Sequence, residues 1–143
     1  MNERAGLGRR ALARLVDALP FVAAAWSGHP LLYLLGVMWL LLADGLLPSS
    51  GGRASPGKWI ARVSVAWYDP DAQARAPDLR ESIVRNLPVA GVALLGIHPI
   101  GWVLLPVVGL GLLGTEVYLA LRDPEGRRLG DRLAGTMVMG KRT

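Results

Sequence analysis

The chain has 143 residues, enough for a single domain, and 52% of them are hydrophobic, which is far too many for a soluble domain of this size. Its net charge of +5 would suggest nucleic acid in a soluble protein, but beside long apolar stretches basic residues more often set orientation in a membrane, so we expect no nucleic-acid partner. With no cysteine and only two histidines, the sequence excludes a disulfide framework and a thiolate site, and we expect neither a metal nor a cofactor.

The charged residues divide the chain into alternating basic and apolar parts. All sixteen lysines and arginines fall in three blocks, Arg4–Arg14, Arg53–Arg85 and Arg122–Arg142. The stretches Ala18–Ala43 and Asn86–Thr115 between them carry no formal charge. Basic blocks stay on the cytoplasmic side of a membrane, so each apolar stretch must cross and return as a helical hairpin. A three-span alternative has one tilted, kinked helix from Leu87 to Leu121, which would carry the last basic block outside.

Length and turn residues place the membrane helices. A full span needs about 20 residues, so two spans per stretch require flanking amphipathic residues as well. His-Pro pairs at His29 and His98 mark the outer turns, because proline suits the first turn of a returning helix. We therefore expect one all-α integral membrane domain over residues 1–143, with two helical hairpins and both termini cytoplasmic. The expected helices are Leu12–Ser27, Pro30–Leu47, Leu79–Ile97 and Pro99–Leu121, with a cytoplasmic loop at 48–78 and a cytoplasmic tail at 122–143.

The start of the loop resembles a nucleotide-binding motif. From Gly52 to Lys58 it reads G-x-x-x-x-G-K, but the next position of a P-loop needs Ser or Thr to hold Mg²⁺, and here it is Trp59. A P-loop also follows a buried strand, whereas an apolar run of helical length precedes this loop. We therefore expect no nucleotide partner.

The rest of the loop predicts a strand and then the start of a helix. Residues 59–68, WIARVSVAWY, alternate partially and are rich in β-branched and aromatic residues, which predicts a short strand or an interfacial segment ending at the turn Asp69–Asp71. Asp78 and Glu81 then have the spacing of a capping box. Trp59 and Trp67 in this segment are expected at the level of the lipid headgroups.

Four sequence elements follow one another in a characteristic order. They are R-x-x-A-x-x-x-D at Arg10–Asp17, GRASPGKWIARVSV at Gly52–Val65, LRESIVRN at Leu79–Asn86 and RLGDRLAGTMV at Arg128–Val138. In this order they resemble the RDD family of membrane proteins. The resemblance implies a polytopic membrane domain, usually with two or three spans, that is not an enzyme and whose role is mostly unassigned, with transport of unidentified ligands proposed. It also implies that the Gly-Lys loop is a family element and not a nucleotide site.

Asp17 is the residue that most needs a partner. It shares one helical face with Arg10 and Arg14 at the inner end of the first span, and these charges also argue against a signal peptide. An ionised carboxylate at the centre of a bilayer costs about 2.5–3.5 kcal/mol, so Asp17 must be protonated or paired. Its possible partners are Arg14, Arg85 and Lys58.

Two further acids are expected at the same leaflet. Asp44 lies near the inner end of the second span, and Glu116 lies inside the last. Asp131, in a closing segment that could fold back as a helix, is expected to cap that helix or to pair with an arginine of the middle loop. The candidate ion-pair or ligand site comprises Arg10, Arg14, Asp17, Asp44, Lys58, Arg85, Asn86, Glu116, Arg128 and Asp131, and no catalytic residue is expected.

These residues allow two interpretations. The acids either clamp the helices through ion pairs or form a cation or proton site, and Lys58 is either a snorkelling anchor or a contact to lipid phosphate. Small residues at close-approach spacing, such as Gly111 and Gly114, allow packing within or between chains. We expect a multi-pass protein of the cytoplasmic membrane that transports an ion or small polar ligand; alternatively, it is a non-catalytic subunit or assembly partner. A nucleotide-responsive module is the third possibility. Four short spans are few for a lone carrier, so we expect a homo-oligomer or a larger membrane complex.

Overall fold

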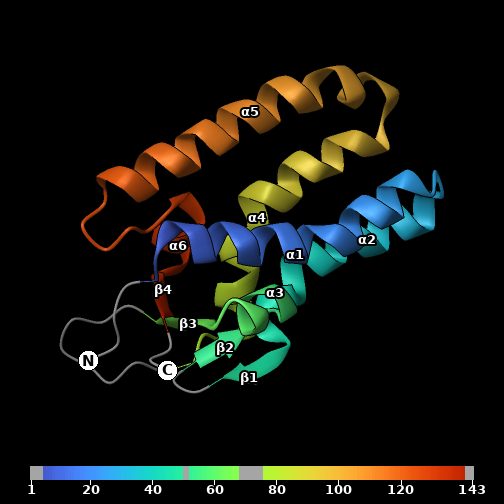
Figure 1. The fold of residues 1–143 in the computed structure, drawn as a ribbon. Coiled ribbons are helices and arrows are strands. Elements are labelled where there is room, and N and C mark those ends of the chain that lie inside the picture. The colour runs from blue at the N-terminus through green and yellow to red at the C-terminus, as the bar shows by residue number, and fades with distance from the viewer. Residues whose placement is uncertain (1–4, 50–51, 68–75, 141–143) are drawn as a thin grey trace.

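The computed structural model describes residues 5–49, 52–67 and 76–140. Within them the chain is mostly helical, with four long helices and one small sheet (Figure 1). The long helices are α1 (Leu7–Trp26), α2 (Pro30–Leu42), α4 (Leu79–Leu94) and α5 (Pro99–Arg122). The short helical segments are η1 (Ala43–Gly45), α3 (Pro56–Ile60), η2 (Leu95–Ile97) and α6 (Leu129–Ala134), and the strands are β1 (Leu47–Ser49), β2 (Gly52–Ala54), β3 (Val63–Trp67) and β4 (Thr136–Gly140).

The long helices form two antiparallel hairpins, α1 with α2 and α4 with α5, as Figure 1 shows. The histidines of the two His-Pro pairs are the N-caps of α2 and α5, and the imidazole Nδ1 of His98 accepts a hydrogen bond from the Ile100 amide at 3.3 Å. The chain reverses at η2, so the continuous helix from Leu87 to Leu121 that the three-span alternative requires is not formed.

Two helix boundaries differ by five residues from those predicted, and α4 ends at Leu94, three residues before the predicted Ile97, because η2 follows it. Helix α1 begins at Leu7 and not at Leu12, because its first two turns are amphipathic and carry little apolar signal. Helix α2 ends at Leu42 and not at Leu47, because η1 and β1 turn the chain into the sheet. The capping box at the start of α4 is confirmed, and the Asp78 amide donates to Glu81 Oε2 at 2.8 Å.

The prediction of an all-α chain is incomplete, because the loop and the tail build an antiparallel sheet in the order β1-β2-β3-β4. The strand predicted in WIARVSVAWY is confirmed as β3, while the turn predicted at Asp69–Asp71 lies outside the described residues. Strand β4 comes from the tail and pairs with β3 over five residues, with Val138 opposite Val65. It was missed because a five-residue strand carries little periodicity and its partner is distant in sequence.

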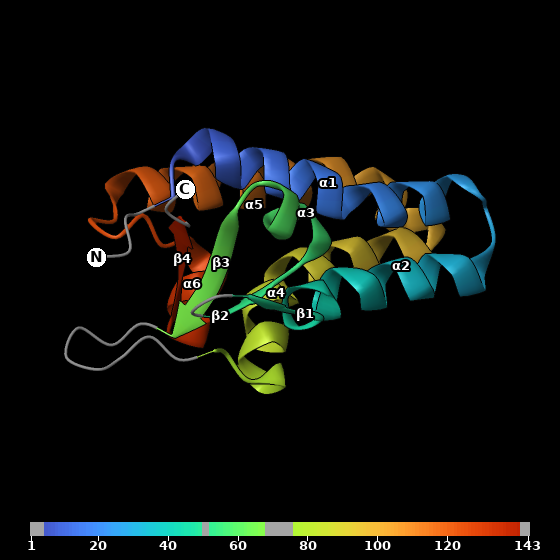
Figure 2. The same ribbon diagram turned by 60° about the horizontal axis from the view of Figure 1, so that its bottom comes forward.

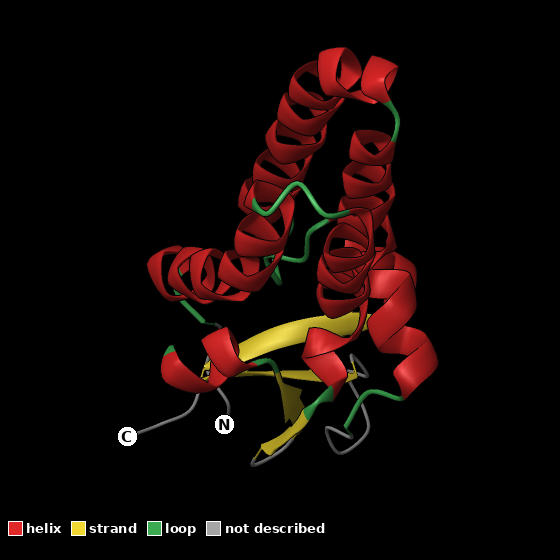
Figure 3. Cartoon of the chain, turned by 90° about the vertical axis from the view of Figure 1, so that its right-hand side faces the viewer, coloured by secondary structure: helices red, strands yellow, loops and turns green. Residues whose placement is uncertain are grey.

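The sheet, α3 and α6 lie together at one end of the molecule, here named the sheet end, and the helices extend away from it (Figures 2 and 3). Beyond that end, α1, α2 and α4 pack through a small apolar core that includes Val37, Leu40 and Ala90. Phe21 and Tyr33 meet edge to face, with ring centroids 5.4 Å apart.

Helix α5 is the one helix among the described residues that is long and apolar enough to cross a membrane. None of its most apolar stretch is buried inside the protein, so it is not the core helix of a soluble fold. Leu110 and Val107, for example, are exposed. Residues Pro30–Gly45 form a shorter apolar helix.

Candidate functional site

The Gly-Lys loop holds the carboxylate of Asp17. The Gly57 amide donates a hydrogen bond to Asp17 Oδ1 at 2.8 Å, and the hydroxyl of Ser55 donates to Asp17 Oδ2. Lys58 Nζ lies 3.8 Å from the same Oδ2. The donors that a P-loop would direct at a phosphate are therefore directed at a carboxylate of the same chain.

Close contact between α3 and α1 makes this arrangement possible. A Cβ on Gly57 would collide with the carbonyl oxygen of Ala13 and would lie 2.8 Å from Asp17 Oδ1. Ser55 is the N-cap of α3, and its Oγ accepts the Lys58 amide at 3.3 Å. Glycine at 57 is therefore required for the loop to reach the backbone of α1.

Lys58 joins two acids from different helices. Its Nζ hydrogen-bonds Asp44 Oδ1 in addition to its longer contact with Asp17, and all three residues are buried. Burial lowers the pKa of Lys58 from 10.5 to about 8, and Asp44 offsets only part of that effect. The lysine is therefore an internal ion-pair partner and not an anchor extended toward solvent.

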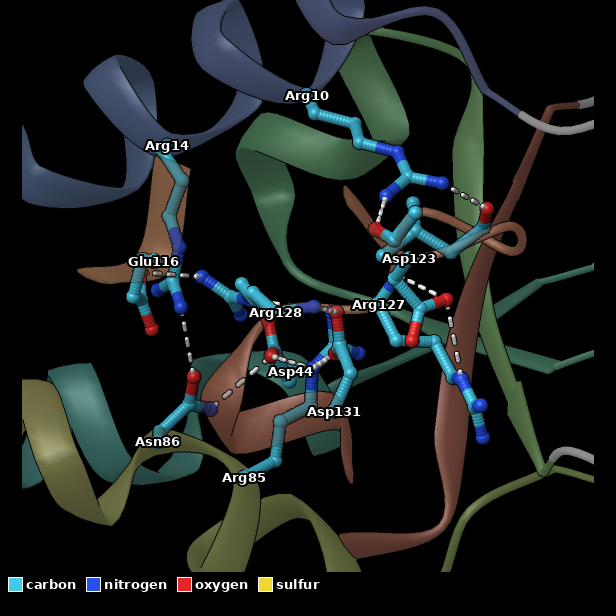
Figure 4. Close-up of polar contacts among 12 residues, drawn as sticks. Arg10, Arg14, Asp44, Arg85, Asn86, Glu116, Asp123, Arg127, Arg128 and Asp131 are labelled. Carbon is cyan, nitrogen blue, oxygen red and sulfur yellow. Dashed lines mark hydrogen bonds and ion pairs between the residues drawn. The ribbon is translucent and has the colours of Figure 1, made fainter. Parts of the chain in front are cut away.

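Arg85 of α4 is fully buried, with 0% of its surface exposed. Its Nε lies 2.7 Å from Asp131 Oδ1 of α6 and 3.6 Å from Asp44 Oδ2 (Figure 4). Burial acts to raise the pKa of Asp131, but Arg85 and Arg128 outweigh it and hold that pKa below its usual value. Helix α6 can approach this closely because residue 130 is glycine, where a Cβ would collide with the Arg85 carbonyl oxygen.

Asn86 connects two of the charged residues. Its Nδ2 donates to Asp44 Oδ2 at 3.0 Å, and its Oδ1 accepts from Arg14 Nη2 at 3.2 Å (Figure 4). The side-chain amide of Asn86 therefore links α1 to η1, the turn that follows α2. Both Asn86 and Asp44 are buried.

Glu116 and Arg10 contact residues of the tail. Glu116 of α5 is 3.6 Å from Arg128 Nη1, and Arg128 is also 3.5 Å from Asp131. The guanidinium of Arg10 donates to the backbone oxygens of Gly126 and Val138, so it ties α1 to the tail (Figure 4).

The structure thus brings the predicted site residues to one end of the molecule, but it changes their pairing. Of the three partners suggested for Asp17, Lys58 is the one found within ion-pair distance. Arg14 instead donates a hydrogen bond to Asn86, and Arg85 forms ion pairs with Asp131 and Asp44. The fold-back of the tail is confirmed, and Asp131 caps α6 by accepting the Arg128 amide at 3.3 Å. Asp131 also pairs with Arg85, which lies on α4 and not in the middle loop where its partner was expected.

We name as the ionic cluster the four basic residues and four acids that meet here, which balance when all are ionised. They are Arg14, Lys58, Arg85 and Arg128 with Asp17, Asp44, Glu116 and Asp131. A cavity of about 610 Å³ lies against the cluster between α1 and α5. Among the described residues, no group of three or more histidine, aspartate or glutamate side chains could hold a metal ion.

Two contributing residues were not identified from the sequence. The Ser55 hydroxyl donates the second hydrogen bond to the Asp17 carboxylate. The Ser-Pro pair at 55 and 56, which is typical of a helix start, could have indicated α3 and its N-cap. Asp123 closes the turn after α5 by accepting from the amides of Glu125 and Arg127 at 2.9 and 3.2 Å and from Arg132 Nε at 3.0 Å. The Asp-Pro pair at 123 was the signal for that turn.

A mostly helical chain with an exposed apolar helix and a buried ionic cluster at one end has the features of a membrane-associated domain. The chain belongs to the RDD family, whose profile matches residues 18–135. It is a family of membrane domains without an assigned molecular role. The match contains the second and third sequence elements and part of the fourth, whereas Arg10–Asp17 lies just before it. No curated protein and no solved structure shows a significant match to the chain.

Proposed function

We propose that this chain is a non-catalytic subunit of a membrane assembly, in which the ionic cluster fixes the inner ends of the helices and α5 meets another chain. The observation that carries the proposal is that each acid of the cluster lies within 4.0 Å of a base of the same chain. A cation entering the cluster would have to displace one of these bases. The geometry therefore favours clamping over cation binding.

The proposed topology has four membrane helices, with the sheet end in the cytoplasm. The basic residues of the loop and tail that the structure describes lie at the sheet end, and the turns that join α1 to α2 and α4 to α5 lie at the other end of the helices (Figure 1). Trp59 and Ile60 on α3 are exposed and are placed to contact the headgroup region.

Helix α5 is the proposed assembly surface. A Cβ at Gly111 or Gly114 would meet nothing within 4 Å, so packing within the chain does not require glycine at either position. Glycines on an exposed membrane helix allow another helix to approach closely.

The state of association tests this proposal. The wild-type protein, extracted from its native membrane with surrounding lipid, should have a mass above that of one chain by native mass spectrometry. Gly111→Leu should reduce the particle to a single chain without lowering the thermal stability of the monomer. Gly8→Leu is the matched control, because a Cβ at Gly8 also meets nothing within 4 Å but lies on α1. A wild-type particle that contains one chain alone would refute the assembly role.

Proton-linked ion transport is the second candidate. It is favoured by the cavity, which Asp17 and Glu116 line together with Lys58, whose pKa of about 8 lies close to physiological pH. In proteoliposomes with an imposed pH gradient, a transporter should show ion flux that Asp17→Asn abolishes while the variant stays folded. Absence of flux from folded wild-type protein would exclude this function.

A further inference from the structure

The cavity between α1 and α5 has two chemically different parts. Leu15 on α1 and Leu113 and Val117 on α5 belong to its apolar wall. Charged side chains also line the cavity at the sheet end; they are Arg10 and the residues of the ionic cluster other than Asp44, and together they are named the charged wall. A ligand that fills both parts must have a polar head and an apolar tail.

The charged wall has an excess of positive charge. Five basic residues line it, namely Arg10, Arg14, Lys58, Arg85 and Arg128. Three acids line it, namely Asp17, Glu116 and Asp131, which leaves +5 − 3 = +2. Asp44 is not part of this wall; it contacts Lys58 and Arg85, and counting it still leaves +1. The head group that suits this wall is therefore an anion.

Several arginine donors on this wall lack a hydrogen-bond acceptor. Arg85 is fully buried, and neither its Nη1 nor its Nη2 has a partner among the residues that the structure describes. The same holds for Nη2 of Arg128. Buried donors are rarely left unpaired, because each such group loses its hydration without compensation. Phosphate oxygens suit paired arginine donors in number and geometry.

We propose that this cavity binds an anionic phospholipid, with its phosphate at Arg85 and Arg128 and an acyl chain along the apolar wall between α1 and α5. Basic pockets between membrane helices on the cytoplasmic side are known to bind lipid head groups of this charge. The head then lies at the level of the sheet end, and the tail lies alongside α5. The lipid supplies the acceptors that the arginines lack and covers part of the apolar wall.

The head-group contact is tested by lipid binding to purified protein. In nanodiscs of phosphatidylcholine, adding phosphatidylglycerol should raise the melting temperature and give a protein–lipid adduct by native mass spectrometry. Arg128→Gln should weaken the apparent affinity for phosphatidylglycerol by about tenfold or more, as expected for loss of a charge-assisted hydrogen bond. Arg132→Gln is the control, because Arg132 lies on α6, the helix that Arg128 precedes as N-cap, is exposed and pairs with Asp123 outside the cavity. Equal adduct formation with phosphatidylcholine and phosphatidylglycerol would overturn the proposal.

A second variant separates lipid from free phosphate and leaves every charge in place. Val117→Trp should fill the apolar part of the cavity and abolish the phosphatidylglycerol adduct, whereas Val107→Trp, on an exposed part of α5 away from the cavity, should not. Inorganic phosphate alone should give little stabilisation. If inorganic phosphate stabilises the protein as strongly as the lipid does, and Val117→Trp has no effect on either, the cavity is a site for free anions and the lipid assignment is wrong.

Discussion

At the sheet end, helices α1, α4 and α6 meet through buried charges and glycine contacts, whereas α5 extends away with most of its apolar side chains exposed. Around Arg85 the ion pairs with Asp131 and Asp44 limit which side chains can be neighbours, because a buried charge without its partner is costly. Along α5, which we propose to lie in the bilayer, any apolar side chain would be solvated about equally well, so the protein specifies little beyond length and hydrophobicity. Sensitivity to substitution should therefore differ sharply between the two regions.

The largest effect is expected from Gly57→Val. Its Cβ would overlap the Ala13 carbonyl oxygen, so α3 would have to move away from α1 and release Asp17. We expect a loss of about 5 kcal/mol or more, seen as little folded protein and a much lower melting temperature in detergent. Gly8→Val is the control, because a Cβ at that position has open space. Unchanged melting of Gly57→Val would contradict the described contact between α3 and α1.

The next effect concerns the ion pair of Lys58 with Asp44. Asp44→Asn and Lys58→Met should each destabilise the protein by about 3–5 kcal/mol, because each leaves a buried charge without its partner. The double variant should lose clearly less than the sum of the two, and a double-mutant cycle of unfolding free energies measures the difference. Additive losses would show that the pair is not coupled.

A smaller effect should appear as a pH dependence that comes from Asp123. Burial acts to raise the pKa of Asp123, but hydrogen bonds from Arg127, Glu125 and Arg132 lower it from 3.8 to about 2. Because the pKa is lower in the folded state, the stabilisation is complete above the unfolded value and is lost as the pH falls from about 3.8 to about 2. The melting temperatures of wild type and Asp123→Asn, measured over this pH range, should converge as the pH falls. A constant difference between them would show that Asp123 does not titrate there.

The smallest effect is expected on α5. Leu110 is 69% exposed, so Leu110→Ala should change the unfolding free energy by no more than about 0.5 kcal/mol. Leu40 is 8% exposed and packs in the core between α2 and α4, so Leu40→Ala should cost about 2–5 kcal/mol. Equal losses from the two variants, measured in the same detergent, would remove the distinction between the regions.

The helices were predictable because charge blocks, apolar stretches and His-Pro turns are local signals. The starts of α2, α4 and α5 matched the structure, whereas the first turns of α1 and the end of α2 did not. Pairing of β3 with β4 was not predictable, because it joins the middle loop to the tail through contacts that a single strand does not encode.

The charged residues of the ionic cluster were predictable, but their pairing and the contribution of Ser55 were not. Asp17, Asp44 and Glu116 were recognisable because acids in or beside apolar helices need compensation. The loop donates to Asp17 from the Ser55 hydroxyl and the Gly57 amide, and these hydrogen bonds form only because α3 lies close to α1. That distance is set by tertiary packing, and the only local sign of it was the glycine itself.

The way in which the loop encloses Asp17 has a consequence for the order of biogenesis. Asp17 leaves the ribosome with α1, but its donors at Ser55 and Gly57 are synthesised only after α2. Two of the residues that contact Asp44, Arg85 and Asn86, are synthesised later with α4. Asp131, which pairs with Arg85, is synthesised only after α5. Each hairpin therefore carries charges that only a later part of the chain can neutralise. The cluster is complete only when both hairpins are in place, so in the proposed four-helix topology it would couple insertion of the first hairpin to insertion of the second.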